Sequence, residues 1–182
     1  MTTAEWRFCP HCATPLEPRE TGGRARLACP IGHFVHWSNP LPVLAALVEY
    51  EGRILLARNA LWTHGMFALI TGFLEAGETP EQGMARELKE ETNLDADRLT
   101  LIGVYEFMRK NELIIAYHVE ASGTIALNEE LAEFRLVAPH RLRPWRAGTG
   151  YAVADWMRAR NLEVEFVDPP PRPAPEPVGL PD

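Results

Sequence analysis

One segment near the middle of the chain encodes its own helix at both ends, and this constrains the fold more than any other feature. The run TPEQ at residues 79–82 fits a capping box, in which Thr79 caps the helix and the side chain of Gln82 reaches back. Asn93 suits the left-handed conformation in which many helices end. The sequence therefore predicts a helix over residues 80–92.

One face of this predicted helix is acidic. At about 100° per residue, Glu87, Glu90 and Glu91 fall within an arc of roughly 100°. Gly83 lies in the same arc one turn earlier and is expected to leave room for something bulky. The arc is expected to hold no lysine or arginine, so the three carboxylates repel one another. The adjacent face suits a hydrophobic core and consists of Met84, Ala85, Leu88 and Thr92.

A hard cation would offset the repulsion on the acidic face. Mg²⁺ takes oxygen ligands and bridges carboxylates to the phosphates of a substrate. For a bare E-x-x-E-E pattern, a solvated acidic surface is the alternative interpretation. The glycine-rich turn ITGFLEAGE ahead of the helix favours the metal site, because such turns let backbone groups approach a phosphate or a metal closely.

The region around this helix alternates between short strand patterns and one further helix. Strands are predicted at Val43–Tyr50, Arg53–Arg58, Phe67–Ile70, Leu99–Met108, Leu113–Glu120 and Phe134–Val137, and a second helix at Tyr151–Arg160. Several strands with few helices are typical of an α+β sandwich with a mixed sheet.

Composition divides the chain into three parts. Residues 1–40 carry all three cysteines and read as a small loop-rich module. Residues 41–161 form the predicted α+β domain. Residues 162–182 include seven prolines, all in the last fifteen positions, and predict a disordered or polyproline tail.

Charge and cysteine content exclude several classes of protein. A formal net charge of −7 disfavours binding driven by nucleic-acid phosphates. Three cysteines are too few for a disulfide framework, which predicts a reducing compartment. The sequence shows neither a signal peptide nor an apolar run long enough to span a membrane, so a cytoplasmic location is expected.

Residues 72–94 resemble the Nudix box, G-x(5)-E-x(7)-R-E-U-x-E-E-x-G-U, where U is aliphatic. The matching residues are Gly72, Glu78, Arg86, Glu87, Leu88, Glu90, Glu91 and Leu94. Asn93 replaces the late glycine, and it also tolerates the left-handed conformation. Ile70-Thr71 stands where relatives have Pro-Gly or Pro-Ala.

The resemblance implies a Nudix α/β/α sandwich and hydrolysis of nucleoside-diphosphate-linked molecules with Mg²⁺ or Mn²⁺. It also implies roles for individual residues. Arg86 would orient a carboxylate, and Glu78 would anchor the loop before the helix. The implied metal ligands or water-activating groups are Glu87, Glu90 and Glu91, with the carbonyl of Thr71 as a further ligand.

The order of motifs along the chain resembles the zinc-ribbon Nudix group, which includes NADH, FAD and ADP-ribose pyrophosphatases. The S-Q-P-W-P-F-P-x-S element of NADH pyrophosphatases is absent, which favours a substrate of the FAD or ADP-ribose type. Candidates for stacking on a base are Trp62, Phe67, Tyr105 and Phe107, with core packing as the alternative for each. Candidates for phosphate contacts are Arg58, Arg109 and Lys110, with solvated surface charge as the alternative.

The cysteines have the spacing of a zinc ribbon. Cys9 and Cys12 form a C-x-x-C, and Cys29 follows 17 residues later. Relatives carry a fourth cysteine where this chain has Gly32. His33 would complete a structural Cys₃His zinc site, and His36 and His11 are weaker candidates. The alternative is a ribbon that has lost its metal and is held together by packing.

Two further functions stay open. One is a non-catalytic Nudix and ribbon module that binds a nucleotide or RNA, which the intact glutamates and Arg86 argue against. The other is a hydrolase that decaps RNA 5′ ends, which the charge of −7 argues against. The expected partner is a small nucleotide. Nucleic acid is disfavoured, and formation of a homodimer is left open.

Overall fold

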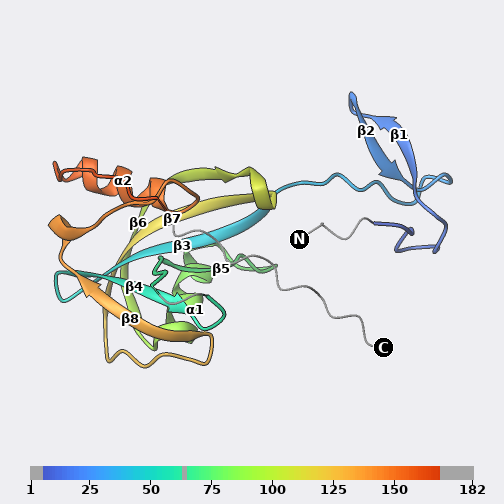
Figure 1. The fold of residues 1–182 in the computed structure, drawn as a ribbon. Coiled ribbons are helices and arrows are strands. Elements are labelled where there is room, and N and C mark those ends of the chain that lie inside the picture. Colours follow the sequence, from blue (N-terminus) through green and yellow to red (C-terminus); the bar gives the residue numbers. More distant parts are fainter. Residues whose placement is uncertain (1–5, 63–64, 169–182) are drawn as a thin grey trace, which may run out of the picture. The chain divides into compact units, whose positions relative to one another are not determined.

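The computed structural model describes residues 6–62 and 65–168, and the chain forms two compact units, Met1–Pro40 and Leu41–Asp182 (Figure 1). The boundary between them falls at the end of the cysteine-containing segment. In the part of the chain that the structure describes, no helix has the length and apolar character needed to cross a membrane.

The first unit contains an antiparallel hairpin of β1 (Glu17–Thr21) and β2 (Arg24–Ala28). Gly22 and Gly23 connect the strands with φ angles of 59° and 72°, the left-handed region that a tight hairpin turn requires. The predicted elements do not include this hairpin. Its strands are mostly exposed and polar, so they lack the apolar alternation that marks a strand in a sequence.

The second unit is built on a mixed sheet of six strands. These are β3 (Leu41–Tyr50), β4 (Arg53–Asn59), β5 (Ile70–Phe73), β6 (Asp95–Phe107), β7 (Glu112–Ser122) and β8 (Leu131–Val137). The order across the sheet is β6-β7-β3-β4-β8, and β5 also pairs with β3. The β3–β7 pair is parallel and the other pairs are antiparallel.

Strand β3 pairs with two different strands along one edge. Its residues Val48–Tyr50 pair with β4, whereas Val43–Ala46 pair with β5. The opposite edge of β3 is occupied by β7 over its whole length. Strands β4 and β5 therefore separate from each other beside β3, and an isolated bridge joins Ala57 to Ala68 where they diverge.

Helices α1 (Pro80–Thr92) and α2 (Gly150–Ala159) cover opposite faces of this sheet (Figure 1). Alternate residues of β3 point to each side. Leu44 packs in the cluster beneath α1 with Met84 and Leu88, and Leu47 packs in the cluster beneath α2 with Met157. All five are fully buried. The predicted α+β sandwich with a mixed sheet is confirmed.

The predicted ends of α1 are also confirmed. The Thr79 side chain accepts a hydrogen bond from the Gln82 backbone, and the Thr79 N–H donates to Oε1 of Gln82 at 2.9 Å. Asn93 closes the helix with a φ of 60°, and its N–H donates to the carbonyl of Lys89. The local sequence alone therefore determines both ends of the helix that carries the acidic residues.

Several element boundaries differ from the predicted ones: β6 begins at Asp95 rather than Leu99, and β8 at Leu131 rather than Phe134. The strand predicted at Phe67–Ile70 lies three residues later, at Ile70–Phe73, because those residues have the hydrogen-bonding partners on β3. Short 3₁₀ turns occupy Met108–Lys110 and Pro139–Arg141.

The start of the predicted tail packs against the second unit. Leu162 and Val164 contact the core cluster beneath α2, and the Val167 N–H donates to the carbonyl of Pro144 at 2.8 Å. Residues 162–166 alternate between apolar and acidic side chains, which accounts for this packing. The proline-rich part of the predicted tail, from residue 169 onward, lies outside the described residues.

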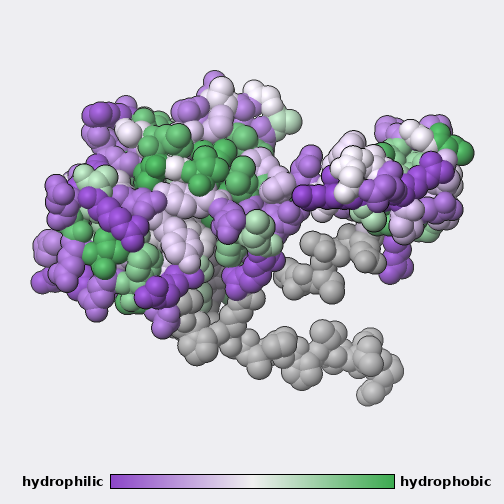
Figure 2. Space-filling model, turned by 90° about the horizontal axis from the view of Figure 1, so that it is seen from above, coloured by the Kyte–Doolittle hydropathy of each residue, from purple (hydrophilic) through white to green (hydrophobic). Residues whose placement is uncertain are grey.

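The surface of the second unit mixes charged and apolar groups. Seen from the side of α2, apolar residues form a group with charged residues around it (Figure 2). Large apolar side chains exposed in this unit include Leu101, Val104 and Met108. Much of the accessible surface of any folded protein is apolar, so exposure of this kind does not by itself indicate a binding site.

Candidate functional site

The acidic face of α1 meets strand β5 at Gly72. A Cβ atom placed on Gly72 would overlap the carboxylate of Glu87. Any other residue at this position would therefore displace that carboxylate from the sheet. The need for a residue without a side chain at position 72 thus comes from Glu87, fifteen positions later. This contact explains why the box has a glycine and a glutamate at this spacing.

Arg86 connects the carboxylates to the loop that precedes the helix. Its Nη2 lies 2.8 Å from Oε1 of Glu78, and its Nη1 lies 2.9 Å from Oε1 of Glu87 and 3.2 Å from Oε2 of Glu90. Nη2 also donates to the carbonyl of Phe73 at 3.2 Å. The hydrogen bonds from Arg86 lower the pKa of the Glu78 carboxyl, and the same carboxylate accepts from the Glu75 N–H at 2.8 Å.

No basic residue lies within the acidic arc itself, as predicted, but the expectation that its carboxylates have no basic partner is wrong. Arg86 sits next to the arc on the helix, and its long side chain reaches the neighbours at one and four positions further on. The interpretation of Gly83 is also corrected. A Cβ there would lie 2.7 Å from Cδ1 of Leu44 and would crowd Glu78, so this glycine makes room for the core and the loop.

Two of the three glutamates on the acidic face of α1 lie where a negative charge is unfavourable. Glu91 is only 6% exposed, and burial, followed by the charges of Glu87, Glu130 and Glu90, raises its pKa to about 8. Burial also raises the pKa of Glu87, against the opposing effect of Arg86. Glu90 points outward, with a side chain that is 58% exposed. The negative charges of Glu87 and Glu91 are thus poorly compensated by the positive charges of the protein.

Glu130 is a fourth carboxylate at this site, and the sequence patterns did not indicate it. The loop before β8 is fastened to the end of α1, since the Asn128 N–H donates to the carbonyl of Glu91 at 3.1 Å. The Glu130 carbonyl in turn accepts from the Ala60 N–H at 2.8 Å. No local pattern connects residue 130 to a helix that ends 38 positions earlier. A glutamate in the loop just before the last strand is the one sequence signal that could have indicated it.

A small cavity of about 60 Å³ lies between the diverging strands β4 and β5. Its lining residues are Ala57, Asn59, Trp62, Leu69, Thr71, Glu91, Glu130 and Leu131. The cavity therefore brings together three residues singled out from the sequence: the metal-ligand candidates Thr71 and Glu91 and the stacking candidate Trp62. Trp62 is 38% exposed, so one part of its indole is open to solvent.

The other aromatic candidates do not line this cavity. The Arg135 guanidinium lies over the ring of Phe67, 3.9 Å from its centroid. Phe107 packs against the core beneath α2 and carries the Arg109 guanidinium 5.0 Å from its centroid. The hydroxyl of Tyr105 donates to Asp155 at 2.9 Å.

The basic candidates are also engaged elsewhere. Arg58 is buried, and its Nε donates to Oε1 of Glu133 at 2.7 Å. The ammonium of Lys110 lies 5.8 Å from the centroid of the Phe107 ring and 3.6 Å from a carboxylate oxygen of Glu112. Neither basic side chain is among those that line the cavity beside Glu91.

The first unit brings its three thiols and one imidazole together. Ligand atoms of Cys9, Cys12, Cys29 and His33 all lie within 4.8 Å of one another. The sulfurs of Cys12 and Cys29 are 3.7 Å apart, close to the ~3.8 Å expected in a tetrahedron with Zn–S bonds of about 2.3 Å. Hydrogen bonding with Thr14 lowers the pKa of the Cys12 thiol to about 6, which favours the thiolate that binds metal.

The conformation of each loop accounts for this arrangement. In the first loop the Ala13 N–H donates to the carbonyl of Cys9, and in the second the Gly32 N–H donates to the carbonyl of Cys29, both at 2.9 Å. Gly32 has a φ of 84°, so the chain turns sharply there and His33 follows the turn. The weaker candidates lie against aromatic rings, His36 against Trp6 and His11 against Phe34.

Comparison with known proteins agrees with the geometry of the second unit. A family profile described as the NUDIX domain matches residues 39–157. The chain is 32% identical over 128 residues to a protein named NAD-capped RNA hydrolase NudC from Vibrio atlanticus (strain LGP32), covering 66% of this chain and 44% of that protein.

A protein of the same name from Pseudomonas putida is 26% identical over 166 residues, covering 89% of this chain and 59% of that protein. The chain spans about half the length of the curated relatives it matches. A solved Nudix hydrolase from Nitrosomonas europaea shares the fold, with a TM-score of 0.71, 24% identity, and coverage of 90% of this chain and all of that one. The chain belongs to the Nudix family.

Proposed function

We propose that this chain hydrolyses the diphosphate bond of nucleoside-diphosphate-linked molecules, using Mg²⁺ or Mn²⁺ held by the glutamates of α1. The observation that carries this proposal is the convergence of Glu87, Glu91 and Glu130 beside a small cavity that Thr71 also lines. Burial and neighbouring carboxylates raise the pKa of Glu87 and Glu91, so the charged forms of these two groups are unfavourable in the protein alone. A divalent cation would compensate them, and carboxylate and carbonyl oxygens are the ligands it prefers.

Glu87, Glu90 and Glu91 would hold the metal, with the Thr71 carbonyl and Glu130 completing the oxygen ligands. The metal would neutralise the charge of the diphosphate and lower the pKa of water. Arg86 fixes the carboxylates of Glu87 and Glu90, so their orientation is set before substrate arrives. Trp62 offers a partly exposed aromatic surface at the cavity for a nucleotide base.

The reaction that this arrangement supports is attack of water on one phosphorus atom. A new P–O bond forms to the oxygen of water, and the bond from phosphorus to the bridging oxygen breaks. A carboxylate of the cluster accepts the proton that water loses. The products are two phosphate monoesters, one from each half of the substrate.

Nucleoside diphosphates joined to a second nucleoside or to a sugar are the substrate class that we propose, either free or, for a dinucleotide, attached to the 5′ end of RNA. Support comes from the names of the relatives, which act on NAD-capped RNA according to those names. The absence of the S-Q-P-W-P-F-P-x-S element separates this chain from NADH pyrophosphatases and keeps FAD and ADP-ribose among the candidate substrates. The relatives also weaken the expectation that nucleic acid is disfavoured.

A substrate panel tests this proposal directly. NADH, FAD, ADP-ribose, diadenosine polyphosphates and a 5′-NAD-capped oligonucleotide are incubated with the protein and Mg²⁺, and the products are separated. We expect nucleoside monophosphates together with the phosphorylated remainder. Inorganic phosphate released from AMP or FMN as the main product would contradict the proposed reaction. Tight nucleotide binding without turnover would instead support the non-catalytic module.

Replacing Glu91 with Gln tests the carboxylate cluster. The change keeps the size of the side chain but removes a negative charge from the proposed metal site. We expect kcat to fall by about 10² or more, as for loss of a key electrostatic or acid–base group. Lys89→Gln is the matched control, because Lys89 lies on the same helix and its ammonium is directed to Asp95 at 2.9 Å. Equal activity of the two variants would contradict the proposed role of Glu91 in catalysis.

The same substitution should change the dependence of stability on pH. Without divalent metal, Glu91 has a folded-state pKa of about 8, above the value of roughly 4.3 for an unfolded glutamate. The contribution of Glu91 to the free energy of unfolding is therefore most favourable below pH ~4.3, where the carboxyl is protonated in both states. This contribution is lost as the pH rises through about 8. Thermal unfolding in buffer free of Mg²⁺ should therefore show Glu91→Gln a few degrees more stable than wild type at pH 9, and equal to it near pH 4. The control is Glu129→Gln, at an exposed position, for which a similar gain would contradict the assignment.

We also propose that Cys9, Cys12, Cys29 and His33 bind one structural zinc ion. Elemental analysis should find about one Zn per chain, and Cys29→Ser should lose it and unfold the first unit at lower temperature. Replacement of His11, which lies against Phe34, by Asn is the control and should keep the metal. A folded wild-type protein without zinc would show that packing alone maintains this unit.

A further inference from the structure

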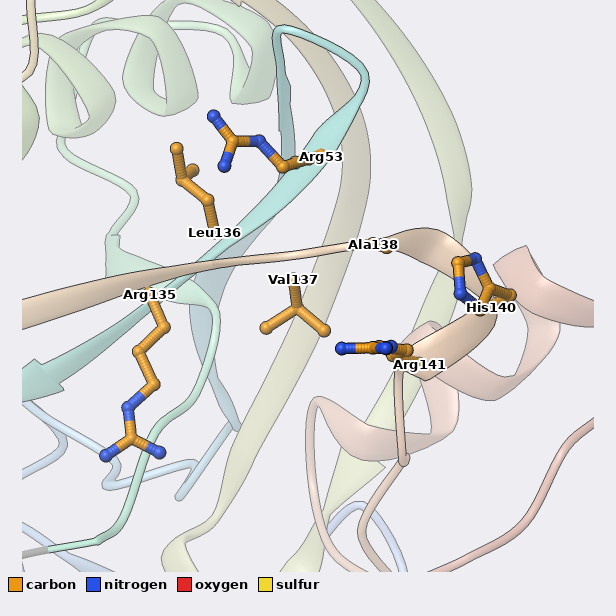
Figure 3. A pocket seen from close by; sticks show the side chains of 7 residues that line it. All are labelled: Arg53, Arg135, Leu136, Val137, Ala138, His140 and Arg141. Atoms are coloured by element: carbon orange, nitrogen blue, oxygen red, sulfur yellow. The ribbon is translucent and has the colours of Figure 1, made fainter.

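A second, larger groove of about 630 Å³ lies at the end of β8 and along the turn that follows it (Figure 3). Its lining residues are Arg53, Arg135, Leu136, Val137, Ala138, His140 and Arg141. Three guanidinium groups and an imidazole thus line one groove, and no carboxylate does. This is an unusual concentration of positive charge in a chain whose formal net charge is −7.

The charge of this groove is largely uncompensated. Within residues 6–62 and 65–168, the side chains of Arg135 and Arg141 form no ion pair. Arg53 lies 3.6 Å from Oε2 of Glu51, and both side chains are about half exposed or more. Exposed ion pairs of this kind contribute little free energy, so Arg53 can exchange Glu51 for a bound phosphate.

The groove follows an edge of the sheet. Strand β8 is last in the strand order and pairs only with β4 among the described strands. In Figure 3 the side chains of Arg135 and Val137 leave β8 on one side, and those of Arg53 and Leu136 lie on the other. Arginines on both sides of an unpaired strand edge can contact an extended anionic chain together with the free N–H groups of the backbone.

The same strand connects the groove to the cavity beside Glu91. Leu131, the first residue of β8, lines that cavity. Arg135 follows four residues later, about 13 Å further at 3.3 Å per residue. The Arg135 guanidinium also covers Phe67, in the loop that connects Trp62 to Leu69, and both of those residues line the cavity.

We propose that this groove binds the phosphodiester backbone of single-stranded RNA whose 5′ dinucleotide is cleaved in the cavity. This inference rests on the proposed function and adds a binding site to it. Guanidinium groups bind phosphate through two parallel hydrogen bonds, and the ring of Phe67 supports the Arg135 guanidinium at the groove. The acidic surface elsewhere would repel the RNA, so binding is confined to the groove and guided along β8.

The test compares one capped and one free substrate. The groove variant Arg135→Gln/Arg141→Gln is assayed with a 5′-NAD-capped decanucleotide and with free NAD at several salt concentrations. The matched control is Arg98→Gln/Arg158→Gln, which removes the same charge from exposed arginines paired with Glu120 and Asp155. Thermal unfolding confirms that both variants are folded.

We expect the ratio of kcat/KM for the capped oligonucleotide to that for free NAD to fall about tenfold in the groove variant and to stay constant in the control. The slope of log affinity against log salt, measured for the oligonucleotide, should decrease by about 0.7 for each RNA phosphate that the groove no longer neutralises. An unchanged ratio and slope, with normal cleavage of free NAD, would overturn the inference and leave the proposed function intact. If wild type cleaves neither of these two substrates, the inference fails, and the proposed function fails with it only if FAD and ADP-ribose are not cleaved either.

A competition experiment separates RNA from other sources of phosphate. The capped oligonucleotide is displaced either by an uncapped decanucleotide with a 5′ monophosphate or by tripolyphosphate. We expect the uncapped oligonucleotide to compete far more strongly, because the groove extends along several residues of β8. Equal competition by tripolyphosphate would make the groove a site for free polyphosphate and would overturn the assignment to RNA.

Discussion

The contacts of one arginine hold the candidate active site together. Arg86 joins Glu78 of the preceding loop to Glu87 and Glu90 of the helix, and it also donates to the carbonyl of Phe73 at the end of β5. A strand, a loop and a helix are thereby fixed relative to one another. Without this charge the carboxylates would repel one another freely, so the arginine makes an acidic cluster compatible with a folded protein.

Arg86 compensates the carboxylates only in part, and the remaining negative charge is what the proposed divalent cation would neutralise. Arg86 reaches Glu87, yet burial still raises the pKa of that carboxyl. Glu91 lies deeper, beyond the reach of the guanidinium, and Glu130 faces it from another element. Part of the uncompensated charge therefore lies beside the cavity on buried Glu91, whereas Glu90 and Glu130 are exposed. A protein surface that is simply acidic would leave its carboxylates exposed and solvated.

The sequence predicted what local rules control. The caps at Thr79 and Asn93, the buried face of α1 and the mixed sheet follow from residue pattern and helical geometry. Spacing also identified the cysteines and His33, whose ligand atoms the structure brings together.

Long side chains and contacts between distant segments escaped prediction. Arg86 reaches an arc that the helical wheel assigns to others, because a wheel ignores the length of a side chain. Phe67 and Phe107 looked like candidates for base stacking because they are aromatic, but their rings contact arginines outside the cavity. The position of Glu130 beside α1 depends on contacts between two segments that are separated in the sequence by the β6–β7 hairpin. A pattern within a short stretch of sequence cannot reveal such contacts.

The attachment of the Glu130 loop has a consequence for how this fold tolerates change. The loop is tied to α1 by a main-chain hydrogen bond, from Asn128 N–H to the carbonyl of Glu91, and by a second one from Ala126 to Thr92. Backbone bonds do not depend on which side chains are present. The turn that joins β6 to β7 can therefore lengthen, shorten or change in sequence over evolutionary time while the fourth carboxylate keeps its place beside the helix.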